Sequence, residues 1–364
     1  MSVTTGMIGK GFYDRNSAPQ WQAIEAILPW LGAAAESLPL DDDAPALTIA
    51  DFGCSEGQNS LEVMRHLVPH LRARTDRPVL TVHSDLPTND FSGLLARLQP
   101  GEAPAIGTGV YSALVAGSMF DQLLPPATTH LAMTFNAIGF LSRRPLDKLP
   151  GYILPNGPSA VRGIGCVTAE ELAVLAAQAN ADLEAFLRAR AAELVPGGRL
   201  LVEVFGVSAD GRTCDGIYDA LNDAVLEVLD AGLIDRAGYE TFYQPVYLRS
   251  LDELIAPVRN AEASCGQLFT LDDARTYEVA VPFVETFRRT GDLATYARRY
   301  TDFFRAFTEP VLQAAFAADD PQELADGVYE RAERLVREHP ERYPFRYFSV
   351  AALLTRRPGG PTTS

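Results

Sequence analysis

The chain has 364 residues, of which 47% are hydrophobic and 21% are charged, and its formal net charge is −16 at pH 7. This composition is typical of a folded globular protein with a sizeable core. The acidic excess argues against a nucleic acid or an anionic membrane as partner, because both require a field of Lys and Arg. No apolar run approaches about 18 residues and the N-terminus lacks the apolar stretch of a signal peptide, so we expect a cytoplasmic protein.

The four cysteines are scattered along the chain. There is no Cys-x-x-Cys pair and no Cys/His cluster with the spacing of zinc ligands, so we expect no metal site. No catalytic constellation of His, Cys or Ser stands out either.

The first part of the chain alternates short apolar strands with helices. The strands are apolar throughout rather than alternating, which is typical of a parallel sheet buried on both faces. Strands with helices between them predict a doubly wound, Rossmann-like α/β core. The expected strands are 46–52, 78–84, 110–116, 129–135 and 200–205, the last after a Pro196-Gly197-Gly198 turn; the expected helices are 58–73 and 168–194.

Further along the chain the alternation stops. Residues 211–262 and much of 291–338 show helical spacing of apolar residues, which predicts an α-helical cap over the ends of the strands. A final strand is expected at 345–354. The predicted division is a core of residues 1–210 and 263–356, a cap of 211–262 with part of 291–338, and a disordered tail of 357–364.

The sharpest local motif is DFGCSEGQNS, residues 51–60, at a junction between a strand and a helix. Gly53 and Gly57 permit a tight turn and close approach of a ligand to the backbone, and the helix N-terminus offers unpaired N–H groups. The motif is not the G-x-G-x-x-G of a nicotinamide site. Asp51 suits the ammonium of a methionine moiety, and Asp85, closing the second strand, suits ribose hydroxyls. The alternative is a turn that serves only chain reversal.

Six segments resemble, in order, the successive motifs of the SABATH methyltransferases. The resemblance spans nearly the whole chain. It implies a core that binds S-adenosylmethionine (SAM), an α-helical cap, an N-terminal segment (1–25) over the active site, and frequently a homodimer. It also implies methyl transfer to carboxylates of small acids or, in one branch, to ring nitrogens of xanthines. The segments are GFYDRNSAPQ (11–20), DFGCSEGQNS (51–60), SDLPTNDF (84–91), VAGSMFDQLLP (115–125), LVPGGRLLVEVFG (194–206) and RAFTEPVLQAAF (305–316).

By position, the resemblance assigns cofactor contacts to four parts of the chain. Residues in the first two parts hold the amino acid end of SAM, and residues in the last two hold the ribose and the adenine. Met119 stands where the family usually has Phe, so a thioether replaces an aromatic face. The predicted cofactor residues are Ser17, Asp51, Gly53, Asn59, Asp85, Leu86, Ser118 and Met119.

The acceptor site departs from the family pattern. Gln20 matches the glutamine that hydrogen-bonds the substrate carboxylate, but Phe140 stands at the tryptophan that would be the second donor, and phenylalanine cannot donate. Asn136 stands where salicylate-type members carry an aromatic hydroxyl; either it supplies the missing hydrogen bond or the acceptor differs. Tyr218 falls near a cap tryptophan that sandwiches aromatic substrates, and Tyr243 is a further candidate. For each aromatic residue the alternative is core packing.

The sequence is therefore interpreted as a SAM-dependent O-methyltransferase that forms the methyl ester of a small aromatic carboxylic acid by in-line transfer. A carboxyl group with a pKa of about 4 is already ionised at neutral pH, so the enzyme must align and dehydrate it rather than remove a proton. Three alternatives stay open: N-methylation of a heteroaromatic ring, a non-catalytic SAM-binding protein, and a nicotinamide oxidoreductase.

Overall fold

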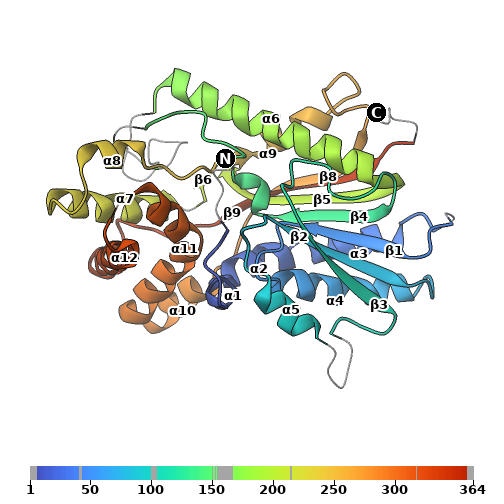
Figure 1. The fold of residues 1–364 in the computed structure, drawn as a ribbon, viewed down its shortest axis with the longest axis horizontal. Helices are drawn as coiled ribbons and strands as arrows, with labels where there is room; N and C mark the ends of the chain where they lie inside the picture. Colours follow the sequence, from blue (N-terminus) through green and yellow to red (C-terminus); the bar gives the residue numbers. More distant parts are fainter. Residues whose placement is uncertain are drawn as a thin grey trace.

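The computed structural model describes residues 6–40, 43–99, 105–149, 151, 153, 167–213, 215–316 and 318–358. Within them, nine strands form one sheet in the order β3-β2-β1-β4-β5-β9-β8, with short β6 and β7 paired to β5 (Figure 1). The strands from β3 to β5 are parallel, and β9 is antiparallel to both neighbours. The strands are β1 (Leu47–Phe52), β2 (Val79–Asp85), β3 (Val110–Ala116), β4 (Thr129–Phe135), β5 (Leu194–Ser208), β6 (Gly211–Arg212), β7 (Arg249–Ser250), β8 (Phe269–Glu278) and β9 (Phe348–Arg356).

This sheet confirms the predicted doubly wound core. β1 pairs with both β2 and β4, so the strand order reverses at β1. In such sheets a crevice opens outside the carboxyl ends of the strands at the point of reversal, and ligands bind there. The DFGCSEGQNS loop follows β1 directly, which places it at this crevice.

The predicted strands are confirmed to within a few residues, with two differences. The predicted Pro196-Gly197-Gly198 turn lies inside β5, because Gly197 takes a φ of 79° and the pairing with β4 shifts register there instead of ending. β8 has no counterpart among the predicted strands. It is an edge strand rich in charged residues, so its pattern lacks the apolar run that marks a buried strand.

Helices cover both faces of the sheet (Figure 1). On one face lies α6, which begins with a capping box between Thr168 and Glu171. Its residues Phe186 and Leu187 pack on the sheet. The other face is covered by α2, α3 and α4, whose apolar residues share a second core with β1 and β4. The bounds are α2 (Ala18–Glu25), α3 (Leu28–Glu36), α4 (Gln58–Arg72), α5 (Ser92–Leu98) and α6 (Ala169–Glu193).

A helical lobe lies at one end of the sheet, at the left of Figure 1. Its core is rich in aromatic side chains, with Tyr300, Phe303 and Phe345 meeting edge to face. These contacts tie α11 to the segment that leads into β9, so the lobe is anchored to the sheet. The lobe comprises α7 (Asp215–Asp230), α8 (Arg236–Thr241), α10 (Pro282–Thr290), α11 (Leu293–Ala315) and α12 (Pro321–Glu338).

The predicted cap segment 211–262 is divided in the structure. Its first part forms α7 and α8 of the lobe, but α9 (Leu251–Ile255) packs against the sheet through Leu254. The change occurs at Arg249, where β7 pairs with β5. The buried Arg249 guanidinium donates to the carbonyl oxygens of Ile138 (2.5 Å) and Ala179 (2.6 Å). Helical periodicity alone could not reveal which of two cores this helix joins.

The N-terminal segment bridges the lobe and the sheet. The backbone N–H of Ile8 donates to Ala306 of α11 (3.0 Å). On the sheet side, the Glu56 carboxylate accepts hydrogen bonds from the N–H groups of Gly11 (2.5 Å) and Asp14 (3.3 Å). Arg97 of α5 forms an ion pair with the buried Asp14 in α1 (Phe12–Asn16). Residues 6–16 are thereby held across the carboxyl ends of the strands.

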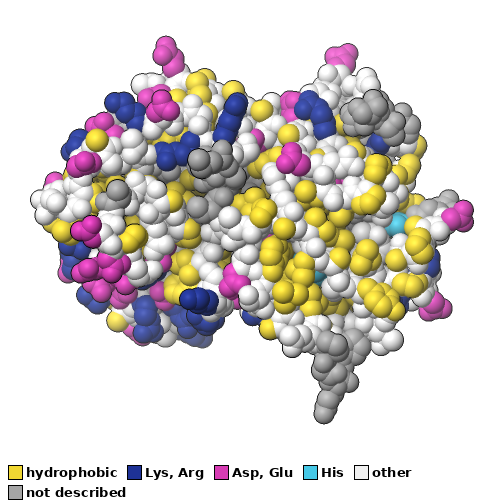
Figure 2. All heavy atoms as spheres, viewed as in Figure 1, with side chains coloured by type: hydrophobic (Ala, Val, Ile, Leu, Met, Phe, Trp, Pro, Cys, Tyr) yellow, Lys and Arg dark blue, Asp and Glu magenta, His cyan; other side chains and the backbone are white. Residues whose placement is uncertain are grey.

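The structure describes the C-terminal end of the chain as far as Pro358. Of the predicted tail, Arg357 is held by the carbonyl oxygens of Gly266 and Phe269, whereas residues 359–364 lie outside the described part of the chain. No helix among the described residues is long and apolar enough to cross a membrane. On the face in Figure 2, basic and acidic side chains are interspersed over the helical lobe, and the coloured atoms show no continuous basic field.

Candidate functional site

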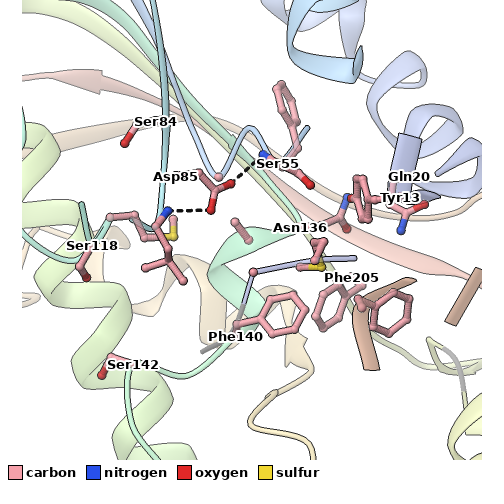
Figure 3. Close-up of a pocket in the computed structure, with 18 of the residues that line it drawn as sticks. Tyr13, Gln20, Ser55, Ser84, Asp85, Ser118, Asn136, Phe140, Ser142 and Phe205 are labelled. Atoms are coloured by element: carbon pink, nitrogen blue, oxygen red, sulfur yellow. Dashed lines mark hydrogen bonds between the residues drawn. The ribbon is translucent and has the colours of Figure 1, made fainter. Parts of the chain in front are cut away.

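A cavity of about 370 Å³ lies between the carboxyl ends of the strands and the helical lobe. A small void of about 20 Å³ adjoins it, and Gln20, Gly53 and Asn136 line both. Figure 3 places Asp85 and Ser118 at one side of the cavity and Gln20 and Asn136 at the other. The cavity therefore has two sides, and the void, lined by Asp51 and Asn59, adjoins the side with Gln20 and Asn136.

The loop after β1 lines both the cavity and the void. The N–H groups of Gly53 and Cys54 both donate to the carbonyl oxygen of Ser84, at 2.8 and 3.0 Å, which fixes the loop against β2. Gly53 has a φ of 95°, and a Cβ atom there would lie 2.2 Å from the Cβ of Ala137. Only glycine fits this conformation and this spacing. The backbone is therefore open to close approach by a ligand.

Asp85 is held rigidly at the end of β2. Its carboxylate accepts hydrogen bonds from the N–H groups of Ser55 and Leu86, both at 2.7 Å (Figure 3). Burial raises the pKa of Asp85, and the two backbone donors oppose that rise. The remaining lone pairs are available to the cavity, as a diol ligand requires. Leu86, Ser118 and Met119 line the cavity beside it, as predicted.

Asp51 is a buried carboxylate beside the small void. Its Oδ1 atom has no hydrogen-bond partner among the described residues, and its side chain is 2% exposed. Desolvation raises the pKa of Asp51 to about 7; a hydrogen bond with Ser60 opposes the rise, and the neighbouring Asp85 adds to it. A buried carboxylate with an unpaired oxygen is costly unless a cation or a proton neutralises it. The void beside Asp51 therefore suits an ammonium group.

Asn59 and Ser17 lie next to this void in different ways. Asn59 lines it, and its Nδ2 atom donates to the Ser17 hydroxyl (3.5 Å). Ser17 itself contributes to neither lining, because its hydroxyl is turned to the carbonyl oxygen of Asp14 (3.2 Å). In this arrangement Ser17 supports Asn59 rather than facing the void.

The affinity for a ligand that carries an ammonium group should depend on pH through Asp51. The pKa of Asp51 in the protein without ligand is about 7. Protonation below that pH therefore removes the negative charge that attracts the ammonium group. We expect the Kd for SAM to rise by up to about tenfold per unit as the pH falls from 7 to 5.5. Calorimetry should detect proton release on binding at pH 6. The variant Asp51→Asn should bind SAM weakly, and its Kd should depend less on pH than that of the wild type. An equally steep dependence in this variant would exclude Asp51 as the group that causes it.

The acceptor side of the cavity is lined mainly by apolar side chains, and it carries the two side-chain amides of Gln20 and Asn136. Gln20 lines both the cavity and the void, and its buried Oε1 atom has no hydrogen-bond partner among the described residues. Asn136 begins the turn after β4 with a φ of 61°. Phe140 meets Phe205 edge to face, with ring centroids 6.0 Å apart, and Tyr218 of α7 lines the lobe side. The structure thus brings together four of the five predicted acceptor residues.

Tyr243 is the exception. It is fully buried outside the cavity, where it packs with Leu141 and Leu175. Its hydroxyl donates to the carbonyl oxygen of Leu146 (2.8 Å), and the Arg144 guanidinium lies over its ring at 4.2 Å. Its prediction as a substrate contact is therefore not supported by its position, and the alternative of core packing describes it.

Several lining residues have no counterpart in the sequence prediction. Tyr13 lies in the first resemblance segment and could have been found there. Phe303 and Phe307 are four residues apart, so they share one face of α11, which helical spacing could have indicated. Phe205 and Tyr347 lie on or next to central strands and look like ordinary core residues in the sequence. The unpredicted aromatic lining residues are Tyr13, Phe120, Phe135, Phe205, Phe303, Phe307 and Tyr347.

Glu203 is a second buried acid, in β5 beneath the acceptor side. It is fully buried, and neither carboxyl oxygen has a hydrogen bond of normal geometry among the described residues. Desolvation raises its pKa from 4.5 to about 8, against the smaller opposing effects of Ser349 and of the Asn136 backbone. The folded state therefore binds a proton more tightly than the unfolded state, and Glu203 reduces stability progressively as the pH rises from about 4.5 to 8.

Glu203→Gln should remove this pH dependence. We expect the difference in Tm between the variant and the wild type to increase in favour of the variant from pH 5 to pH 8, by several degrees, and to level off above pH 8. Differential scanning fluorimetry across this range measures it. Glu330→Gln, at an exposed position of α12, is the matched control and should show no such trend. A constant difference across the range would contradict the proposed protonation of Glu203.

Comparison with known proteins gives a consistent result. A family model described as "SAM dependent carboxyl methyltransferase" matches residues 2–357. The chain is 26% identical over 379 residues to "Probable jasmonic acid carboxyl methyltransferase 1" of Theobroma cacao, covering 96% of each. It is 30% identical over 324 residues to "O-methyltransferase acrG" of Aspergillus aculeatus, covering 82% of this chain and 81% of that protein. The solved structure "Loganic acid methyltransferase with SAH" matches the fold with a TM-score of 0.79 and 22% identity, covering 98% of this chain and 99% of that one.

Proposed function

Because the chain belongs to the family of SAM-dependent carboxyl methyltransferases, we propose that it forms the methyl ester of a small aromatic carboxylic acid. SAM dependence and a small carboxylic acid as acceptor follow from the family. The aromatic character of the acid is our inference. It is carried by one observation: the acceptor side of the cavity is walled by aromatic rings and carries two neutral amides, Gln20 and Asn136.

The predicted cofactor residues fit SAM. Asp51, with its unpartnered carboxyl oxygen, suits the ammonium of the methionine moiety, and Asp85 suits the ribose diol. Gly53 lines both the cavity and the void, and its missing side chain makes room for Ala137. When bound, SAM supplies a methyl group carried on a sulfonium sulfur. We propose that Leu86, Ser118 and Met119 form the adenine pocket, since all three line the cavity beside Asp85.

The acceptor carboxylate would be held by hydrogen bonds rather than by an ion pair. No Lys, Arg or His side chain lines the cavity in the described part of the chain. The amides of Gln20 and Asn136 can each donate a hydrogen bond to one carboxylate oxygen. Phe140, Phe205 and Tyr218 exclude water from that oxygen, which makes it a better nucleophile. No general base is needed, because the carboxylate is already ionised at neutral pH.

This arrangement favours a carboxylate over the alternatives. The family match speaks for carboxyl rather than ring-nitrogen methylation, and the loop after β1 lacks the glycine pattern of a nicotinamide site. A non-catalytic role would leave the aromatic acceptor side without a purpose. The homodimer and the cytoplasmic location that we expect from the sequence stay predictions.

A labelled transfer experiment tests the proposal. Purified protein is incubated with methyl-deuterated SAM and benzoic, salicylic, anthranilic, cinnamic, indole-acetic and aliphatic acids, with xanthine-type heterocycles included as rival acceptors. We expect a deuteromethyl ester of at least one aromatic acid by mass spectrometry. An ester of an aliphatic acid alone would contradict the aromatic preference, and an N-methyl product alone would establish the rival activity. SAM binding, measured by calorimetry, shows independently that the protein is folded.

A further inference from the structure

The side chains of Asn136 and Tyr347 form a buried hydrogen bond at the wall of the cavity. The Tyr347 hydroxyl donates to the Oδ1 atom of Asn136 at 2.8 Å. Both residues line the cavity, and both are buried: Asn136 is 8% exposed and Tyr347 is 2% exposed. Asn136 follows β4, and Tyr347 precedes β9, which is separated from β4 by β5. The bond therefore crosses the sheet at the acceptor side.

In the structure this hydrogen bond engages the oxygen end of the Asn136 amide and leaves the nitrogen end to a ligand. With Oδ1 engaged by Tyr347, the two N–H bonds of Nδ2 are left, and Nδ2 has no acceptor among the described residues. The backbone of Asn136 is held as well, because its N–H donates to the carbonyl oxygen of Glu203 (2.8 Å). An amide rotated by 180° would instead donate from Nδ2 to the hydroxyl oxygen and turn its own oxygen toward the ligand.

Tyr347 is itself held in place. Its ring meets Phe303 of α11 edge to face, with centroids 6.3 Å apart. Its carbonyl oxygen accepts a hydrogen bond from the N–H of Val279 (2.8 Å). The hydroxyl therefore approaches Asn136 from a fixed direction, set by the lobe on one side and by the strand pairing on the other.

From this geometry we propose that Tyr347 is a positioning residue that turns the donor end of the Asn136 amide toward the acceptor. The inference rests on the proposed carboxyl methylation. Together with the NH₂ group of Gln20, it would present two donors to the acceptor. Two donors stabilise an anionic oxygen, which only accepts hydrogen bonds, more than a neutral ring N–H, which needs an acceptor. Tyr347 thereby contributes to the selection of carboxylates.

The variant Tyr347→Phe removes only the hydroxyl. For the acid that is converted best in the panel, we expect KM to rise about five- to tenfold while kcat falls less than threefold, since the loss concerns one neutral hydrogen bond. The Kd for the same acid, measured by calorimetry in the presence of S-adenosylhomocysteine, should rise by the same factor. The Kd for SAM should change less than twofold.

A double-mutant cycle separates positioning from general damage. Asn136→Ala should raise KM by more than Tyr347→Phe alone, and adding Tyr347→Phe to Asn136→Ala should have no further effect, because the hydroxyl acts through the amide. The matched control is Tyr243→Phe, which loses a hydroxyl bond of the same length, 2.8 Å, outside the cavity. It should leave KM and the acid Kd unchanged.

The outcomes distinguish this inference from the proposed function. An unchanged acid Kd in Tyr347→Phe, or additive effects in the double variant, would overturn the positioning role while leaving carboxyl methylation established by the wild type. A wild type that methylates no acid would instead overturn the proposed function, and the positioning role with it. A large rise in the Kd for SAM in Tyr347→Phe would mean that the hydroxyl supports the fold of the site rather than the acceptor amide.

Discussion

Gln20→Glu should lower kcat/KM for the acid by about 10²- to 10³-fold at pH 8, which corresponds to about 2.7–4 kcal/mol. The change keeps the size of the side chain but replaces its donor by a negative charge at the acceptor side of the cavity. The acceptor carboxylate then loses a charge-assisted hydrogen bond and meets a like charge where water is largely excluded. Steady-state kinetics at several pH values measures the effect.

The pH dependence and a second variant identify the cause. Gln20→Leu removes the donor without adding charge, so a loss of only about 10- to 100-fold is expected. As the pH falls toward 5 the introduced carboxyl of Gln20→Glu becomes protonated, and its deficit should approach that of Gln20→Leu. Gln22→Glu, on the same helix but outside both linings, is the control and should retain activity. Equal deficits of Gln20→Glu and Gln20→Leu at every pH would mean that Gln20 only packs.

Asp85→Asn should raise the Kd for SAM about 100-fold, or about 2–3 kcal/mol. The Asp85 carboxylate accepts hydrogen bonds from two backbone N–H groups, those of Ser55 and Leu86. An amide has one acceptor oxygen, so its NH₂ group must face one of these donors, and the loop after β1 must shift. The variant also loses acceptor capacity toward the ribose. Both changes weaken the cofactor end without touching the acceptor amides.

Calorimetric titration with SAM and with S-adenosylhomocysteine measures this effect. Both ligands carry the same ribose, so their affinities should fall by similar factors. Asp76→Asn, an exposed position just before the opposite end of β2, is the matched control and should bind as the wild type does. An affinity within threefold of the wild type for Asp85→Asn would rule out the proposed role of Asp85. A fall for SAM alone would place Asp85 near the sulfonium rather than the ribose.

The cofactor end of the site could be predicted from the sequence because its signals are local. Gly53 and Asp51 belong to one loop after β1, and Asp85 closes the next strand. Neighbouring parallel strands end at the same edge of a sheet, so recognising two strands was enough to bring these residues together. The structure confirms this, with the Ser55 N–H donating to the Asp85 carboxylate at 2.7 Å. Turn chemistry and strand order carry this part of the prediction.

The acceptor end depended on contacts between distant residues. Tyr347 reaches Asn136 across 211 positions of the chain, and no local pattern marks either residue as half of a pair. The sequence also could not separate Tyr218, which lines the cavity, from Tyr243, which is buried elsewhere, because a buried aromatic residue has the same pattern in either place.

The sequence by itself therefore determined the fold class, the glycine-containing loop after β1 and the family resemblance, through hydrophobic periodicity, glycine positions and strand ends. The tertiary structure decided the rest. It assigned α9 to the sheet rather than the lobe and turned Tyr243 away from the cavity. It also joined Asn136 to Tyr347. These outcomes follow from how the lobe packs on the sheet, and side-chain packing of distant segments is a property of the whole chain that local patterns do not contain.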